Sequence, residues 1–202
     1  MRVFGHGDET DINTLASFGR MQSLGVDGVE LDVRRIGDRL VVTHDPGAGG
    51  PLLAEALDAC RGLVVNIEIK NFPRDPEWDE TQRVTDLVLD LLDERGNSDD
   101  VLVSCFHGAC LDRCMQRRPD LPVALLLLSR KPADELLDMP YRIVHPYDSM
   151  VHEAFMAEAR KRDLTVNVWT GSDETIERMK QLAALGVDGI ITAAPEAAMA
   201  AR

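Results

Sequence analysis

The stretch Val26–Asp45, VDGVELDVRRIGDRLVVTHD, carries two acidic residues inside an apolar, β-branched run. Glu30 and Asp32 stand two positions apart, and in a strand such residues point to the same face. We therefore expect their strand to project both carboxylates to one side. A second β-like run, Leu40–Thr43, follows and leads to His44. Two carboxylates and a histidine at strand ends are more than folding requires, so the stretch predicts half of an active site.

Around this stretch, short apolar runs alternate with longer helical patterns. The expected strands are Arg2–Gly5, Gly28–Val33 with its added run Leu40–Thr43, Leu63–Ile69, Val101–Cys105, Pro122–Leu128, Tyr141–His145, Thr165–Trp169 and Gly189–Thr192. The expected helices are Asn13–Leu24, Leu52–Cys60, Asp79–Arg95, Ala109–Arg118, Pro132–Leu137, His152–Arg162, Asp173–Leu185 and an Ala-rich segment from Pro195. Such alternation predicts a parallel sheet with helices on its faces.

The number of repeats selects the architecture. About eight strand–helix units are expected, which is the number in a (β/α)8 TIM barrel, and 202 residues is close to the lower limit for that fold. The alternative is an open doubly wound sheet, which more often has ~5–6 strands. No GxGxxG or GxxxxGK[ST] motif supports a nucleotide-binding sheet. We expect residues 1–202 to form a single barrel domain.

The charge balance excludes several classes of partner. With 22 basic and 35 acidic residues, the formal net charge is −13, which disfavours nucleic acid and anionic membranes. No run approaches the ~20 apolar residues of a membrane span. The N-terminus lacks the apolar segment of a signal peptide, so a cytoplasmic location is expected. The apolar helix stripes are those a barrel exterior needs, and they predict no oligomeric state.

The four cysteines are not spaced as a metal site. Cys60, Cys105, Cys110 and Cys114 include no CxxC pair, and a zinc site would need additional histidines at suitable spacing. We expect reduced, mostly buried thiols.

Polar side chains gather at the predicted strand ends, where barrels of this type place their active sites. The residues at these ends are His6, Glu30, Asp32, His44, Glu68, Lys70, Ser104, His107, His145, Trp169 and Thr192. Four of the five histidines are among them, which predicts a shared polar mouth. For His107 and His145, a loop or helix-start position without chemistry fits the sequence equally well.

Three of these residues predict a metal site. Glu30, Asp32 and Glu68 offer hard oxygen ligands from neighbouring strands, which suits Mg²⁺ or Ca²⁺. The alternative is a set of salt bridges with Lys70 and Arg34. Three acids facing one mouth repel each other unless a cation lies between them, which favours the metal. Histidine titrates near neutral pH, so His6 and His44 are candidates for acid/base catalysis.

These residues, in this order, resemble the glycerophosphodiester phosphodiesterases, a family of PLC-like (β/α)8 barrels. The resemblance covers most of the chain. The motifs that carry it are Gly25-Val26-Asp27-Gly28-Val29-Glu30-Leu31-Asp32-Val33, Val41-Val42-Thr43-His44-Asp45-Pro46, Pro51-Leu52-Leu53-Ala54-Glu55-Ala56-Leu57, Asn66-Ile67-Glu68-Ile69-Lys70, Ser104-Cys105-Phe106, Val168-Trp169-Thr170 and Gly186-Val187-Asp188-Gly189-Ile190-Ile191-Thr192. Any one motif alone would be weak, but their order and spacing together are specific.

The resemblance implies a role for each residue at the mouth. A phosphodiester, as small-molecule substrate, is cleaved to glycerol 3-phosphate or another phosphomonoester and an alcohol. The implied ligands of a divalent cation, Mg²⁺ or Ca²⁺, are Glu30, Asp32 and Glu68. The implied acid/base pair is His6 and His44. Lys70 contacts the phosphate, Trp169 forms a wall of the alcohol pocket, and Asn13 supports the substrate site from the first loop.

The chain departs from the family pattern at four places. The family's HRG reads His6-Gly7-Asp8, the glutamate of its PEN is replaced by Ile12, and its TDxP reads Thr192-Ala193-Ala194-Pro195. The long family insertion between His44 and Glu68 is missing, which predicts a more open site and a larger or less closely gripped alcohol. Because the arginine of HRG would bind phosphate, its loss keeps open a catalytically weak barrel that binds a phosphorylated ligand. A carbonyl lyase with Lys70 as Schiff base is a further alternative.

Overall fold

In this computed structural model, eight parallel strands close into a ring. The structure describes residues 1–7, 12–96, 100–129, 131, 133–171 and 174–202. The parallel strands are β1 (Arg2–Gly5), β2 (Gly28–Ile36), β4 (Val64–Ile69), β5 (Val101–Cys105), β6 (Val123–Leu127), β7 (Ile143–Pro146), β8 (Thr165–Trp169) and β9 (Gly189–Thr192). They follow the order β1-β9-β8-β7-β6-β5-β4-β2, and β1 also pairs with β2. The closed ring confirms the predicted barrel and excludes the open sheet.

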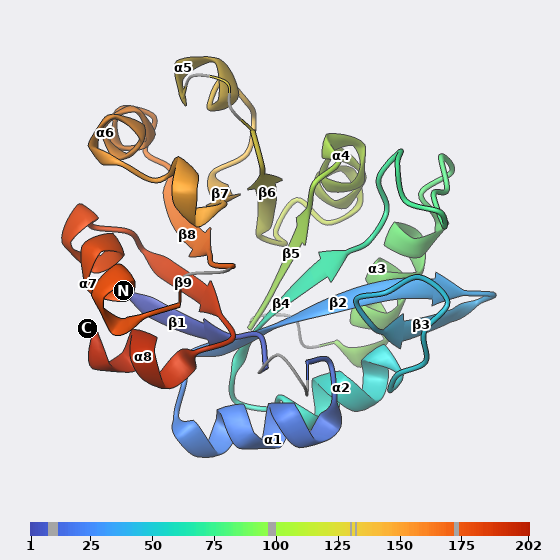
Figure 1. Ribbon diagram of the computed structural model, residues 1–202. Coiled ribbons are helices and arrows are strands. Elements are labelled where there is room, and N and C mark those ends of the chain that lie inside the picture. The colour runs from blue at the N-terminus through green and yellow to red at the C-terminus, as the bar shows by residue number, and fades with distance from the viewer. Residues whose placement is uncertain (8–11, 97–99, 130, 132, 172–173) are drawn as a thin grey trace.

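Helices surround the ring, as Figure 1 shows. They are α1 (Leu15–Leu24), α2 (Leu53–Ala59), α3 (Arg83–Arg95), α4 (Gly108–Arg117), α5 (Ala133–Leu136), α6 (Glu153–Lys161), α7 (Ile176–Leu185) and α8 (Pro195–Ala200), with a 3-10 turn η1 (Asp148–Met150) after β7. The N- and C-termini lie on the same side of the molecule (Figure 1).

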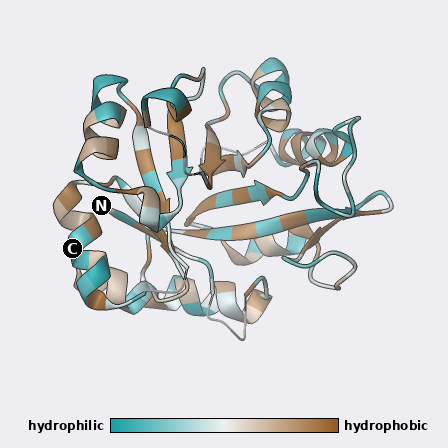
Figure 2. Ribbon diagram, turned by 45° about the horizontal axis from the view of Figure 1, so that its top comes forward, coloured by the Kyte–Doolittle hydropathy of each residue, from teal (hydrophilic) through white to brown (hydrophobic). Residues whose placement is uncertain are grey.

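The core lies between the outer face of the ring and the helices. Every residue of β5 is buried, as expected for a parallel strand covered on both faces. Figure 2 shows the strands as mainly apolar and the outer helices as mixed. Helix α1 illustrates the packing: Phe18 and Met21 are buried, the Thr14 side chain caps its start, and Gly25 ends it at a φ of 74°.

β2 is longer than predicted. The prediction ended it at Val33, but it continues to Ile36 because β3 (Arg39–Val42) pairs with it antiparallel, with Arg34 opposite Val41. Polar residues in this extension obscured the strand in the sequence. The hairpin carries the segment after β3, including His44, to the C-terminal rim of the ring.

Helices α3 and α7 begin three or more residues later than predicted. α3 begins at Arg83 rather than Asp79, because its N-cap residue, Gln82, has a left-handed backbone with a φ of 60°. The Asp79 carboxylate accepts hydrogen bonds from the amides of Thr81 and Arg83 in the turn that precedes the helix. α7 begins at Ile176, and Thr175 is its N-cap. The expected start of α7 at Asp173 lies outside the described residues.

The described helices include none with both the length and the apolar character needed to cross a bilayer. The four cysteines are buried and free, which agrees with the expectation of reduced thiols. The cytoplasmic location stays a prediction.

Candidate active site

A cavity of about 350 Å³ opens at the C-terminal ends of the strands. It is lined by His6, Glu30, Asp32, His44, Asn66, Glu68, Lys70, Phe72, Phe106, Leu126, Trp169, Thr170 and Ile191. The structure therefore brings together in one cavity all but one of the residues for which the sequence predicted a catalytic, metal-binding or substrate-binding role. The exception is Asn13, which is buried beside the cavity.

The acidic centre comes from two paired strands. Glu30 and Asp32 project from the same face of β2, and Asp32 lies in register with Glu68 on β4. The Lys70 Nζ atom lies 2.8 Å from Asp32 Oδ1 and 2.6 Å from Glu68 Oε1. Burial opposes the charge of Lys70, but Glu68 and Asp32 hold its pKa above the ordinary value. This lysine is a fixed cation.

Asn13 fixes the orientation of Asp32. Its Nδ2 donates to Asp32 Oδ2 at 2.8 Å, and its Oδ1 accepts from the Asp32 amide at 3.0 Å. The backbone of Asn13 has a φ of 61°, a conformation that asparagine tolerates better than most residues. The contact is with an acid rather than with the cavity, so substrate binding by Asn13 stays a prediction.

His6 approaches the acids from β1. Its Nε2 lies 3.2 Å from Glu30 Oε2 and 3.5 Å from Asp32 Oδ2. Burial opposes its charge, but Glu30 and Asp32 raise the pKa of His6. Potential ligand atoms of these three residues lie within 4.8 Å of one another. His6 was not among the three ligands predicted from the sequence.

The donor set fits a divalent cation. Burial, together with Asp32 and Glu68, raises the pKa of Glu30, so the isolated centre is short of positive charge. Among the described residues, neither Glu30 oxygen accepts a hydrogen bond, and the Asn66 amide is equally without a partner. Buried polar atoms are rarely left in this state. Hard oxygen atoms that face a cavity suit Mg²⁺ or Ca²⁺.

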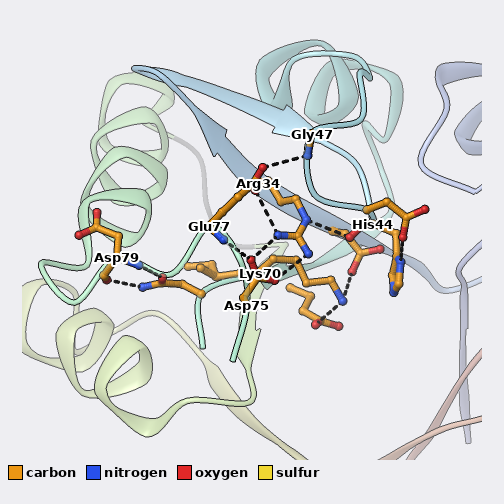
Figure 3. Close-up of polar contacts among 12 residues, drawn as sticks. Arg34, His44, Gly47, Lys70, Asp75, Glu77 and Asp79 are labelled. Atoms are coloured by element: carbon orange, nitrogen blue, oxygen red, sulfur yellow. Dashed lines mark hydrogen bonds and ion pairs between the residues drawn. The ribbon is translucent and has the colours of Figure 1, made fainter. Parts of the chain in front are cut away.

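His44 stands at the rim rather than in the centre. Its side chain is 53% exposed, and its Nδ1 lies 2.8 Å from Asp45 Oδ1. Its carbonyl oxygen accepts a hydrogen bond from Arg34 Nε at 2.9 Å, and Figure 3 shows Arg34 between His44 and two acids, Asp75 and Glu77. Lys70 does form the salt bridges proposed as an alternative to the metal, whereas Arg34 pairs with these other acids.

The opposite wall of the cavity is aromatic, which the sequence indicated only through Trp169. Phe106 lies edge-on to Trp169 with ring centroids 5.9 Å apart, and edge-on to Phe72 at 6.2 Å. Tyr147 supports Trp169 from behind at 4.5 Å. Phe106 follows the predicted strand Val101–Cys105, so the sequence places it among the residues at the strand ends, but it does not show that the ring forms a wall of the cavity.

The expectation of one mouth shared by four histidines is wrong for two of them. His107 packs edge-on against Trp78, with centroids 5.0 Å apart, and does not line the cavity. His145 is fully buried, with its Nε2 at 3.1 Å from Asn167 Nδ2. Burial lowers the pKa of His145 to about 3. The sequence placed these residues at strand ends but could not show which way they point.

The structure also shows what surrounds two of the departures from the family pattern. The Glu174 carboxylate accepts hydrogen bonds from the hydroxyl groups of Thr170 and Thr192 and from the amide of Ala193. A carboxylate is therefore present beside the alanine that replaces the acid of TDxP. Gly7 has a φ of 94°, which favours glycine, and Asp8 lies outside the described residues.

Comparison with known proteins places this geometry in a family. The model of the Glycerophosphoryl diester phosphodiesterase family matches residues 49–197, more than half of the chain. A glycerophosphodiester phosphodiesterase from Caldanaerobacter subterraneus is 26% identical over 240 residues, which cover 96% of this chain and 94% of the relative. One from Bacillus altitudinis is also 26% identical, over 94% of this chain and 92% of the relative.

Solved structures show the same fold. A phosphodiesterase from Oleispira antarctica, in complex with the product sn-glycerol-3-phosphate, has a TM-score of 0.84 at 19% identity and covers 100% of this chain and 96% of its own. A glycerophosphodiester phosphodiesterase from Parabacteroides distasonis has a TM-score of 0.81 at 21% identity, with coverages of 98% and 95%. At these identities the likeness establishes the barrel and not the substrate.

Proposed function

We propose that this chain, which belongs to the glycerophosphoryl diester phosphodiesterase family, cleaves glycerophosphodiesters to glycerol 3-phosphate and an alcohol. As a member of this family it is a phosphoric diester hydrolase. Its proposed acid/base pair is His6 and His44. The observation that carries the proposal is the single cavity in which both histidines lie beside Lys70 and an acidic cluster.

The residues divide the reaction between them. One histidine accepts the proton of the attacking hydroxyl, which belongs to water or to the neighbouring hydroxyl of the glycerol. The other donates a proton to the oxygen of the leaving alcohol as the P–O bond breaks. Lys70, held by Asp32 and Glu68, neutralises a phosphoryl oxygen. Asn13 keeps Asp32 in place through two hydrogen bonds.

Glu30, Asp32 and Glu68 are the proposed ligands of a divalent cation, Mg²⁺ or Ca²⁺. When bound, such a cation would neutralise charge on the phosphoryl group. The Glu30 oxygens, which accept no hydrogen bond from the described residues, support this set most directly. Because His6 Nε2 lies 3.2 Å from Glu30 Oε2, His6 would also lie close to a cation bound by Glu30.

The aromatic wall bears on the alcohol. Phe72, Phe106 and Trp169 offer apolar surface opposite the acids, and the side chain of His44 at the rim is 53% exposed. We propose that alcohols larger than glycerol are accepted. Comparable turnover of glycerophosphocholine and of bulky lysophospholipids supports this, and strict selectivity for the small ester excludes it.

The decisive experiment measures glycerol 3-phosphate release from purified protein, with and without EDTA and with added Mg²⁺ or Ca²⁺. Metal-dependent release that falls strongly, to a measurable residual rate, in His44→Ala supports the proposed hydrolase. Gly7 in place of a phosphate-binding arginine motivates the second candidate, a catalytically weak barrel that binds a phosphorylated ligand. Retained binding of glycerol 3-phosphate without any release would favour that candidate.

The Schiff-base alternative is disfavoured by the state of Lys70. A nucleophilic amine must lose its proton, whereas the two carboxylates beside Lys70 raise its pKa. Borohydride reduction in the presence of a carbonyl substrate should leave the mass of the protein unchanged.

A further inference from the structure

The segment 44–50, which includes His44, is connected to the rest of the described protein by two hydrogen bonds. The His44 carbonyl oxygen accepts from Arg34 Nε at 2.9 Å. The Gly47 amide donates to Glu77 Oε1 at 2.9 Å. The other hydrogen bonds that this segment makes, between Ala48 and Asp45 and between His44 and Asp45, are internal. A catalytic candidate thus stands on a segment with few external restraints.

Both restraints lead to one buried ion cluster. Arg34 pairs with both oxygens of Asp75, through Nη1 at 3.0 Å and Nη2 at 2.9 Å. Its Nη1 also lies 3.2 Å from Glu77 Oε2, while the other Glu77 oxygen holds Gly47. Figure 3 shows this arrangement, with Arg34 in the middle of the cluster.

Arg34 is placed by the same strand that places the acidic centre. It follows Asp32 by two positions on β2, so both side chains project from one face. Its side chain is only 4% exposed, and Asp75 is buried beside it. Burial opposes ionisation of Asp75, but hydrogen bonds from Arg34 and from the Glu77 amide hold its pKa below the ordinary value. The cluster is therefore charged and rigid.

The geometry also excludes Arg34 as a substitute for the arginine that Gly7 replaces. Nε, Nη1 and Nη2 are all committed to protein oxygens, and Arg34 is not among the residues that line the cavity. Freeing the guanidinium for a phosphate would leave Asp75 buried and unpaired, which is costly. Arg34 instead contacts the His44 segment, through the carbonyl oxygen of His44.

We propose that Arg34 and Glu77 are positioning residues that hold the His44 segment over the acidic centre. Arg34 fixes the carbonyl of His44 itself, and Glu77 fixes the turn three residues later. We call Arg34 and Glu77 together the clamp. Because Arg34 and Asp32 share a strand, the clamp sets the position of His44 relative to Asp32. This rests on the proposed function only for the role of His44 in the reaction; the clamp itself is a feature of the fold.

Glu77→Ala is the sharpest test, because Glu77 is half-buried and its loss leaves the Arg34–Asp75 pair intact. We expect kcat for glycerophosphodiester cleavage to fall roughly tenfold, with KM changed less, since a catalytic group displaced by about an ångström costs up to ~100-fold. In a His44→Ala background the same substitution should cost less than about twofold, because coupled residues act as a unit. Glu80→Ala, exposed in the same loop, is the matched control.

Hydrogen exchange measured by mass spectrometry tests, independently of catalysis, whether the clamp restrains the backbone of residues 44–50. Glu77→Ala should speed exchange in peptides covering 44–50 and leave peptides from α3 unchanged. Glu77→Gln should restore part of the protection, since its amide oxygen can still accept from Gly47. Arg34→Lys, which cannot make the same set of bonds, should speed exchange like Glu77→Ala.

The outcomes separate the two proposals. Equal loss of activity from Glu77→Ala in both backgrounds, or unchanged exchange at 44–50, overturns the clamp. If the wild-type protein cleaves no glycerophosphodiester but the exchange pattern follows the prediction, the clamp stands as a structural restraint on the segment and its catalytic role fails with the proposed function. A loss of melting temperature in Glu77→Ala with unchanged kcat also overturns the positioning role.

Discussion

The two sides of the barrel differ in how they affect the charge of an imidazole. On the side of β1, β2 and β4, His6 lies beside Glu30 and Asp32, and its pKa is raised. On the side of β7 and β8, His145 Nε2 lies 3.1 Å from the Asn167 amide nitrogen, and burial lowers the pKa of His145 to about 3. The same ring therefore favours a charged histidine on one side and a neutral one on the other. The acids decide which, because burial opposes the charge in both cases.

The difference also separates two tasks. The acidic half holds the groups that can bind a cation and move protons. The half formed by β5, β6 and β8 contributes Phe106, Leu126 and Trp169 to the same cavity. Apolar groups of this kind discriminate by shape and area and do not take part in proton transfer.

Removing an acid from the charged half should have the largest effect. We expect Glu30→Gln to lower kcat/KM by about 10³-fold, as the loss of a main electrostatic contributor does elsewhere. Calorimetric titration should show weaker Mg²⁺ or Ca²⁺ binding. Without added cation the variant should melt at a higher temperature, since a crowded, buried carboxylate has been neutralised. Retained activity with retained metal affinity would contradict the proposed ligand role, and Glu80→Gln is the control.

The burial of neutral His145 should make the stability of the folded protein sensitive to low pH. Between pH 6.5 and about 3 the unfolded chain protonates His145 while the folded chain does not, so the folded state loses stability as the pH falls. The full effect is on the order of 5 kcal/mol, and part of it should be visible by pH 4.5. Urea unfolding of the wild type and of His145→Gln, at pH 7 and pH 4.5, measures it. Equal loss of stability in the two proteins would show that His145 is not the group responsible.

A change in the aromatic wall should alter selectivity more than chemistry. We expect Trp169→Ala to lower kcat/KM about tenfold more for a diester with a bulky apolar alcohol than for glycerophosphocholine, since apolar surface of this size contributes ~1–3 kcal/mol. The ratio of the two kcat/KM values is the measurement, and the His6–Glu30 side serves as the internal reference. An unchanged ratio would remove Trp169 from the alcohol site.

The sequence predicted the barrel and most of the acidic half because these features depend on short-range pattern. The spacing of Glu30 and Asp32 on a strand, and the order of the strand ends, follow from local geometry. The clamp could not be predicted in this way. Arg34 meets Asp75 and Glu77 across 41 and 43 positions of the sequence, and nothing in the composition of that loop distinguishes these acids from solvated ones.

The same limit explains the histidines. His6, His107 and His145 all stand near strand ends, but whether each points into the cavity, toward a neighbouring loop or into the barrel depends on side-chain packing between distant strands. The extension of β2 is hard to predict for a related reason, since Arg34 and Arg35 are polar and are held by pairing with β3. Local pattern located the site, and long-range packing selected its members.

The pairing of β1 with β9 has a consequence for biosynthesis. Parallel pairing of Arg2–Gly5 with Gly189–Thr192 helps to close the ring, and these two segments are separated by nearly the whole chain. On the ribosome, β1 can pair with β2 early, but its other edge has no partner until β9 has been made. An open parallel edge recruits other strands. Growing chains of this protein should therefore depend on chaperones until the last strand emerges, and then complete the barrel in a single late step.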